Sequence, residues 1–221
     1  MPEPAPTPPP YTRSTIAAAC VDTTSGTRIN PPAGAPDAAW ASTSASFPFP
    51  FKYFGARVGS YTVSSNGFAQ LYAGATGAGS TNRSNATIPA RGEPNGVLAP
   101  YWDHLIPASS YSVVRTLTTG TPGSRAFVIE WYSVRPAGAN HEGETMTFQL
   151  HLFEAGNVVE IHYCAISADA PPTNAAARLP IDGAGATIGI ESFTGTSGAL
   201  RSFNASGAAA TGTGYRFTPI P

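Results

Sequence analysis

The sequence lacks helical periodicity, and this constrains its fold more than any other feature. Gly, Pro or Thr interrupts every stretch of about eleven or more residues in which apolar residues could recur at helical spacing. The chain has 23 glycines and 22 prolines among 221 residues. Segments rich in β-branched and aromatic residues lie between these turn residues, so the pattern predicts about a dozen short strands.

Short strands joined by turns are typical of an antiparallel β-sandwich, here an all-β, jelly-roll-like fold with long loops rich in Gly, Ser and Thr. We expect the Pro-rich residues 1–13 to form an extended linker and residues 14–221 to form one sandwich domain. The first strand is expected at Thr15–Asp22. Ala73–Arg91 and Ala168–Gly185 are expected to be long loops, either functional or disordered.

The clearest hairpin joins Thr145–Glu154 to Asn157–Cys164 through Ala155-Gly156. One face of it is apolar and should lie in the core, with Leu152 opposite Val159, Leu150 opposite Ile161 and Phe148 opposite Tyr163. The other face is polar, with Gln149 beside His162 and His151 beside Glu160. That face is either exposed to solvent or the wall of a groove that a loop covers.

The composition excludes several classes of partner. Only 11% of the residues are charged, against a usual share of about 25%, and the net charge is −1. No basic stripe exists to bind nucleic acid, and no apolar run approaches the length of a membrane helix. Met1–Pro10 has no apolar signal segment, but a low-charge chain with two cysteines fits an exported protein better than a cytosolic one.

Cys20 and Cys164 are the only cysteines, and in an exported protein they most simply form one disulfide. This bond would tie the N-terminal strand to the second strand of the hairpin. The alternative is two separate buried thiols.

A metal site could draw on His151, Glu160, His162 and Cys164. No Cys-x-x-Cys or His-x-x-x-His spacing supports it, and the disulfide uses the same cysteine. A cross-strand pair of His151 and Glu160 is the simpler interpretation. The sequence therefore predicts no metal and no cofactor.

Six motifs follow one another in a specific order, from an aromatic-Gly segment to a Gly-containing strand. They are Phe47-Pro-Phe-Pro-Phe51 with Tyr53-Phe-Gly55, Val63-Ser-Ser-Asn-Gly-Phe68, Leu98-Ala-Pro-Tyr-Trp-Asp103, Phe127-Val-Ile-Glu-Trp131, Thr147-Phe-Gln-Leu-His-Leu-Phe-Glu154 and Ala186-Thr-Ile-Gly-Ile-Glu191. This series resembles bacterial secreted β-sandwich modules and the extracellular domain of nidogen. The resemblance implies an extracellular, non-catalytic module for adhesion, matrix or surface display. After Asp103 the chain departs from the nidogen pattern, with His104-Leu105 in place of further acids, so the resemblance does not imply a calcium site there.

Four residues of these motifs are candidate ligand contacts: Asn66, Tyr101, Trp102 and Asp103. An indole offers a flat face for a sugar ring, so Asp103 beside Trp102 could be an acid in a cleft. In the alternative interpretation Asp103 caps backbone N–H groups of the loop that follows, Asn66 does the same at its turn, and the aromatic residues belong to the core.

No catalytic motif is present. The Gly-x-Ser-x-Gly elbow is missing, and His141-Glu142 is not followed by a second His at metalloprotease spacing. Asp103 with Glu130 or Glu191 could make a glycosidase pair, but nothing in the sequence places them together. We therefore expect a non-enzymatic structural or adhesive module, whose partner is a protein or glycan at the cell surface. Two alternatives stay open, a carbohydrate-binding module and a self-assembling subunit that donates its N-terminal strand.

Overall fold

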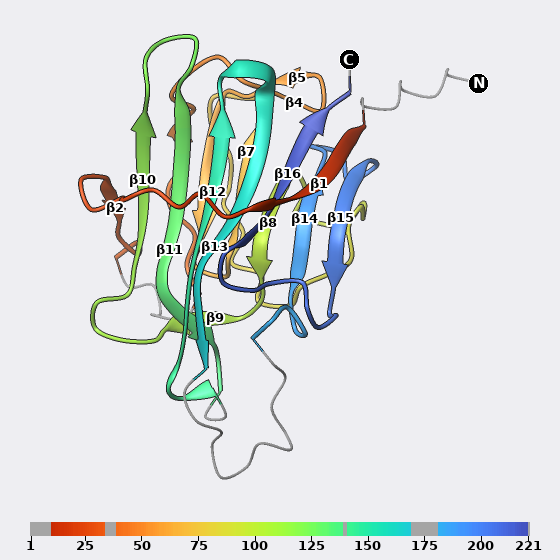
Figure 1. The fold of residues 1–221 in the computed structure, drawn as a ribbon. Helices are drawn as coiled ribbons and strands as arrows, with labels where there is room; N and C mark the ends of the chain where they lie inside the picture. The colour runs from red at the N-terminus through yellow and green to blue at the C-terminus, as the bar shows by residue number, and fades with distance from the viewer. Residues whose placement is uncertain (1–9, 34–38, 139–140, 169–180, 221) are drawn as a thin grey trace.

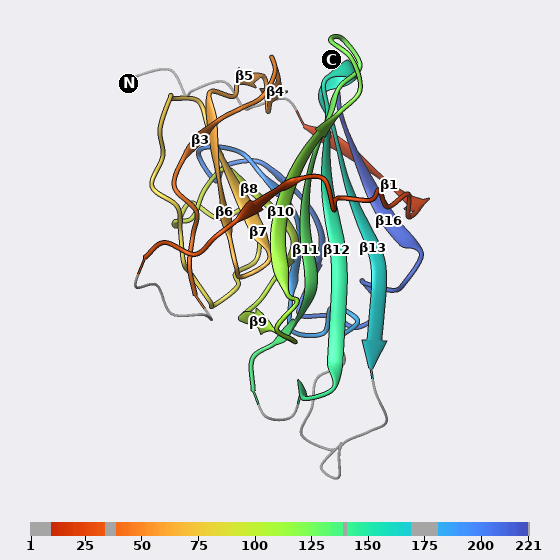
Figure 2. The ribbon, with the colours of Figure 1, turned by 90° about the vertical axis from the view of Figure 1, so that its left-hand side faces the viewer.

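Two antiparallel sheets packed face to face make up the protein, which confirms the predicted β-sandwich (Figures 1 and 2). The computed structural model describes residues 10–33, 39–138, 141–168 and 181–220. Within these ranges no helix is long and apolar enough to span a bilayer.

The larger sheet has eight strands in the order β1-β16-β13-β12-β11-β10-β2, with β9 beside β11. Their bounds are β1 Tyr11–Ala17, β2 Thr27–Ile29, β9 Leu105–Pro107, β10 Val113–Thr119, β11 Ala126–Pro136, β12 Glu144–Phe153, β13 Val158–Ala168 and β16 Thr213–Pro219.

The smaller sheet has six strands in the order β15-β14-β8-β7-β6-β3. Their bounds are β3 Ala45–Ser46, β6 Ser60–Ser64, β7 Phe68–Tyr72, β8 Val97–Trp102, β14 Thr187–Glu191 and β15 Gly198–Phe203. A separate two-stranded hairpin pairs β4, Lys52–Tyr53, with β5, Ala56–Arg57.

The predicted hairpin is confirmed in register as β12 and β13. All three apolar pairs lie opposite one another as expected, and His151 lies opposite Glu160. The ladder ends at Phe153 and Val158, so the connecting loop is longer than the predicted two residues. Gly156, with φ +74°, allows the loop to reverse direction.

The core between the sheets contains a stack of aromatic rings drawn from both of them. The Phe148 ring of the larger sheet lies between Trp131, 5.3 Å away, and Tyr101 of the smaller sheet, 5.9 Å away. All three side chains are buried. Residues from two sheets thus share one continuous apolar layer, which is the main stabilising feature of a sandwich.

The N-terminal part differs from the prediction. Strand β1 starts at Tyr11, inside the segment expected to be linker, and ends at Ala17, well before Asp22. It stops there because the chain leaves the sheet edge. Residues 18–26, which we call the strap, cross the outer face of the larger sheet to reach β2 at the opposite edge (Figures 1 and 2).

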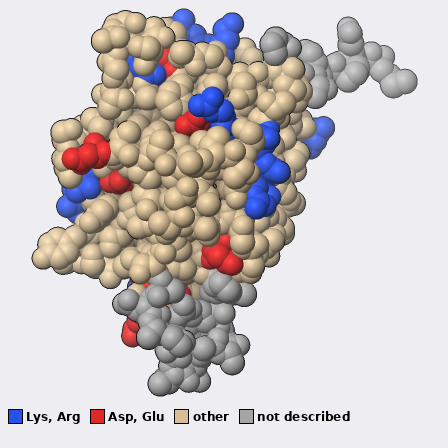
Figure 3. Space-filling model, in the orientation of Figure 1, with Lys and Arg blue, Asp and Glu red and all other residues tan. Residues whose placement is uncertain are grey.

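The two expected long loops have different outcomes. Ala73–Arg91 is an ordered connection whose backbone accepts hydrogen bonds from the smaller sheet. Most of Ala168–Gly185 lies outside the described residues. On the face seen in Figure 3, acidic and basic side chains are sparse and scattered, as the composition predicts.

Candidate functional site

Asn66 has a structural role, although the sequence made it a candidate ligand contact. Its side chain is buried at the turn between β6 and β7. Its Oδ1 accepts a hydrogen bond from the backbone N–H of Leu105 at 3.2 Å, and its Nδ2 donates to the carbonyl of Thr81 at 3.1 Å. The prediction of ligand contact is therefore wrong for Asn66, and the alternative, a cap on neighbouring backbone, is confirmed.

Trp102 is likewise unable to offer a face to a sugar. Its side chain is buried on the outer face of the smaller sheet, with its ring 5.1 Å from that of Phe68. The indole Nε1 donates to the carbonyl of Asn82 at 3.1 Å, so the ordered loop covers the ring. The prediction that Trp102 contacts a ligand is therefore also wrong, because its side chain, like that of Asn66, is buried.

Tyr101 and Asp103 both line a hollow at one end of the sandwich, which we call the end hollow. Its volume is about 510 Å³. Asn85, Asn204, His104 and His141 supply polar groups to it, and the other lining residues are Pro136, Ala137, Ala184 and Gly185. The ligand-binding role of Tyr101 and Asp103 stays a prediction, now tied to a definite place.

Asp103 is the acidic residue in the lining of the end hollow, and its pKa is shifted. Burial raises its pKa to about 6, opposed by a hydrogen bond from the His104 N–H and by the charge of His141. That hydrogen bond, 2.7 Å long, ends on Oδ1. The alternative interpretation of Asp103 as a backbone cap is thus confirmed for one oxygen.

The far wall of the end hollow carries a pair of amides that the sequence analysis did not identify. Asn85 Nδ2 donates to Asn204 Oδ1 at 2.7 Å and to Thr187 Oγ1 at 3.2 Å. His141 reaches the hollow from a third loop, where its Nδ1 lies 2.5 Å from Glu144 Oε2. No sequence signal joins Asn85, His141 and Asn204, because each of the three comes from a different loop.

The hypothetical glycosidase pairs are not assembled. Glu191 lies at the end of β14 that pairs with Leu98, whereas Asp103 follows Trp102 at the opposite end of β8. Glu130 lies under the strap, where Thr23 Oγ1 donates to its carboxylate. Asp103 therefore has neither acid as a partner.

A second polar cluster lies under the strap. The disulfide between Cys20 and Cys164 joins the strap to β13, with the two Cα atoms 5.8 Å apart, which confirms the predicted bond. On either side of it, the Ala19 N–H donates to His162 Nδ1 at 3.1 Å and the Val21 N–H donates to Gln149 Oε1 at 3.0 Å. The polar face of the hairpin is therefore covered by a loop rather than exposed to water.

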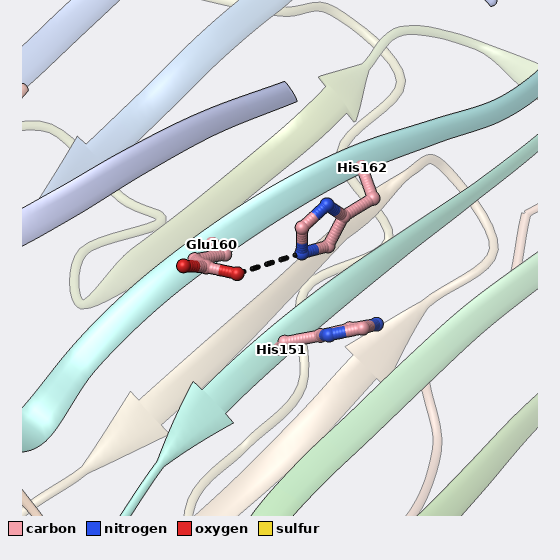
Figure 4. A group of neighbouring side chains, drawn as sticks. All are labelled: His151, Glu160 and His162. Atoms are coloured by element: carbon pink, nitrogen blue, oxygen red, sulfur yellow. Dashed lines mark hydrogen bonds and ion pairs between the residues drawn. The ribbon is translucent and has the colours of Figure 1, made fainter. Parts of the chain in front are cut away.

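Three buried side chains under the strap offer potential metal-ligating atoms. His151, Glu160 and His162 point toward one another from β12 and β13 (Figure 4), and one ligand atom from each lies within 4.8 Å of the others. Glu160 also accepts from Arg216 Nε at 2.5 Å. Burial, and then the neighbouring His162, lower the pKa of His151 to about 3, so His151 is neutral near pH 7.

Comparison with known proteins gives one match. Residues 10–219 match the protein family described as NIDO related. No curated protein and no solved structure matches the chain.

Proposed function

Because the chain belongs to the NIDO-related family, we propose that it is an extracellular, non-catalytic structural or adhesive module that contacts its partner through the end hollow. A covalent bond between the strap and the sheet supports an oxidising, extracellular location. Fold and family alone do not specify a ligand, so the choice of site depends on the geometry of the end hollow.

The observation that carries the proposal is the position of the end hollow relative to the chain ends. Tyr11 pairs with Pro219, so the chain enters and leaves the sandwich at one end. The end hollow is lined by Asp103, just after β8, and by Pro136, the last residue of β11, and these strands end at the opposite end of the sandwich (Figure 1). Loops at one end of a sandwich are a common place for recognition, because the sheets hold them rigidly.

A glycan is the partner that the side chains of the end hollow favour as a second candidate. Asn85, Asn204 and Asp103 provide amide and carboxyl groups, which suit the hydroxyl groups of a sugar. Trp102 and Tyr101 are both buried, so neither offers a stacking face to a sugar, and the recognition would depend on these polar groups.

Self-assembly through a donated N-terminal strand stays a prediction. Strand β1 pairs with β16 of its own chain from Tyr11 to Ala17. A strand from another copy would have to displace this whole ladder, so the structure offers no open position for it beside β16.

Binding to a panel of immobilised glycans and extracellular-matrix glycoproteins tests the proposal, with the chain tetramerised through a C-terminal biotin to raise avidity. Asp103→Asn keeps the Oδ1 acceptor for the His104 N–H and removes the charge. We expect this variant to lose roughly tenfold or more in affinity. Asp22→Asn is the matched control, because Asp22 lies on the strap, far from the hollow, and caps Thr24 in the same way.

Two results would count against the proposal. One is an Asp103→Asn variant that binds its partner as tightly as the unaltered chain. The other is catalytic turnover of a probe that the same substitution abolishes, which would make the chain an enzyme.

A further inference from the structure

We propose that His151, Glu160 and His162 form a metal site of the zinc type, which the strap closes and which reduction of the Cys20–Cys164 disulfide opens. These residues are the buried group under the strap (Figure 4). Cys164 follows them on β13 and acts on the site through its bond to Cys20 of the strap.

The strap determines which ring nitrogen of His162 carries the proton. A backbone N–H can only donate, so His162 Nδ1, at 3.1 Å from the Ala19 nitrogen, must accept. The proton of the neutral ring is therefore on Nε2, which donates to Glu160 Oε2 at 2.9 Å. With the strap in place, both nitrogens of His162 are engaged.

A metal ion at His162 Nε2 would conflict with the strap. The ion takes the place of the Nε2 proton, between the ring and Glu160 Oε2. The ring must then carry its proton on Nδ1, which would point at the Ala19 N–H, so two donors would face each other. Metal binding and the Ala19 hydrogen bond are thus mutually exclusive.

Hydrogen bonds also determine which ring nitrogen of His151 carries the proton. Gln149 donates from Nε2 to the Val21 carbonyl at 2.7 Å, so its Oε1 is the atom that faces the Val21 N–H and His151 Nε2. Since Oε1 only accepts, His151 carries its proton on Nε2 and has its lone pair on Nδ1. A neutral imidazole with one nitrogen held by a hydrogen bond is the usual state of a histidine ligand.

Reduction frees the strap from the sheet. Two thiols of a small reductant become one disulfide, while the Cys20–Cys164 bond takes up two electrons and two protons to give two thiols. The strap is left with hydrogen bonds alone, against which the metal can compete.

The ligand chemistry selects the ion. Two imidazoles and one carboxylate suit Zn²⁺, which binds such a set of three protein ligands with water at the fourth position of a tetrahedron. Arg216 holds only the Oε1 atom of Glu160, so Oε2 can bind the ion without loss of that pair.

The experiment is titration with Zn²⁺ by calorimetry and with Co²⁺ by absorption spectroscopy. Cys20→Ser is the open form, because it removes the disulfide and keeps Cys164. We expect it to bind either ion about 100-fold more tightly than the oxidised chain, and the bound Co²⁺ to show the visible absorption of a tetrahedral site. In this background, His162→Gln should weaken binding by about 10- to 100-fold. Cys164→Ser in place of Cys20→Ser should open the site equally, because it removes the same disulfide. Glu93→Gln, at an exposed position in the loop before β8, is the control and should have no effect.

A further variant separates opening of the site from loss of the disulfide. Ala19→Pro removes the N–H that faces His162 and keeps the Cys20–Cys164 bond. This variant should bind Zn²⁺ through His151, Glu160 and His162 with the disulfide intact. The proposal is overturned if the oxidised chain binds as tightly as Cys20→Ser, or if His162→Gln changes nothing. It also fails if neither Cys20→Ser nor Ala19→Pro binds metal while either retains the circular dichroism of the folded chain.

Discussion

Trp131 of the larger sheet donates a 2.9 Å hydrogen bond from its indole Nε1 to the carbonyl of Ser64 in the smaller sheet. Both partners are buried between the sheets. Ser64 is the last residue of β6, directly before the turn that holds Asn66. One polar contact inside an apolar core thus fixes where β6 ends relative to β11.

Replacing Trp131 with Phe should lower the free energy of unfolding by about 2–3 kcal/mol. The substitution leaves the Ser64 carbonyl buried without its donor and removes part of the ring that stacks on Phe148. Urea denaturation measures the change. Tyr132→Phe, at the neighbouring and partly exposed position, should change stability by less than about 0.5 kcal/mol. Equal effects at the two positions would contradict the role of the cross-sheet bond.

Gly67 should not tolerate a side chain. Its φ is +75°, and a Cβ atom there would lie 1.9 Å from the carbonyl oxygen of Tyr101. Gly67→Ala should therefore destabilise the fold by at least about 3 kcal/mol. The backbone would have to shift to relieve the clash, and the alanine would also have to adopt an unfavourable positive φ. Gly207 has a φ of +76° with open space around it, so Gly207→Ala isolates the cost of the backbone angle, about 1 kcal/mol. The difference between the two midpoints of thermal unfolding measures the clash.

Loss of the disulfide should loosen the strap before the sandwich. In the chain-entropy model, a loop of 144 residues contributes up to about 4–5 kcal/mol, and measured values are often lower. We expect the Cys20→Ser, Cys164→Ser double variant to lose about 2–4 kcal/mol. Hydrogen exchange should show loss of protection at the Ala19 and Val21 amides, which bond to His162 and Gln149. Protection in β12 and β13 should stay, and its loss there would contradict a separate strap.

The hairpin and the disulfide could be predicted from sequence because each depends on local or countable features. The period of two along β12 and β13 fixes which side chains share a face, and this determined the pairing of Leu150 with Ile161. With two cysteines in the chain, only one intramolecular bond is possible. The same period also places Tyr101 and Trp102 on opposite faces of β8.

The strap, the end hollow and the burial of Trp102 could not be predicted in this way. Alternation places Trp102 on the outer face, but only the folded loop shows that Asn82 covers it. The end hollow joins Asn85, Asp103 and His141, which are separated in the chain and share no motif. Contacts between distant loops depend on the packing of whole sheets, which no short pattern in the sequence encodes.

Asp103 should make the protein less stable as the pH rises. Burial raises its pKa from 3.8 in the unfolded chain to about 6 in the folded one, so the folded state binds a proton more tightly. Its favourable contribution is complete below about pH 4 and is lost as the pH rises toward 6. Asp103→Asn removes this titration and keeps the bond to the His104 N–H. We therefore expect the unaltered chain to lose up to about 3 kcal/mol relative to this variant between pH 4 and pH 7. Urea unfolding of both proteins across that range measures the difference, in which the contributions of other groups cancel. A difference that does not change with pH would show that the Asp103 carboxyl group is ionised in the folded protein as easily as in water.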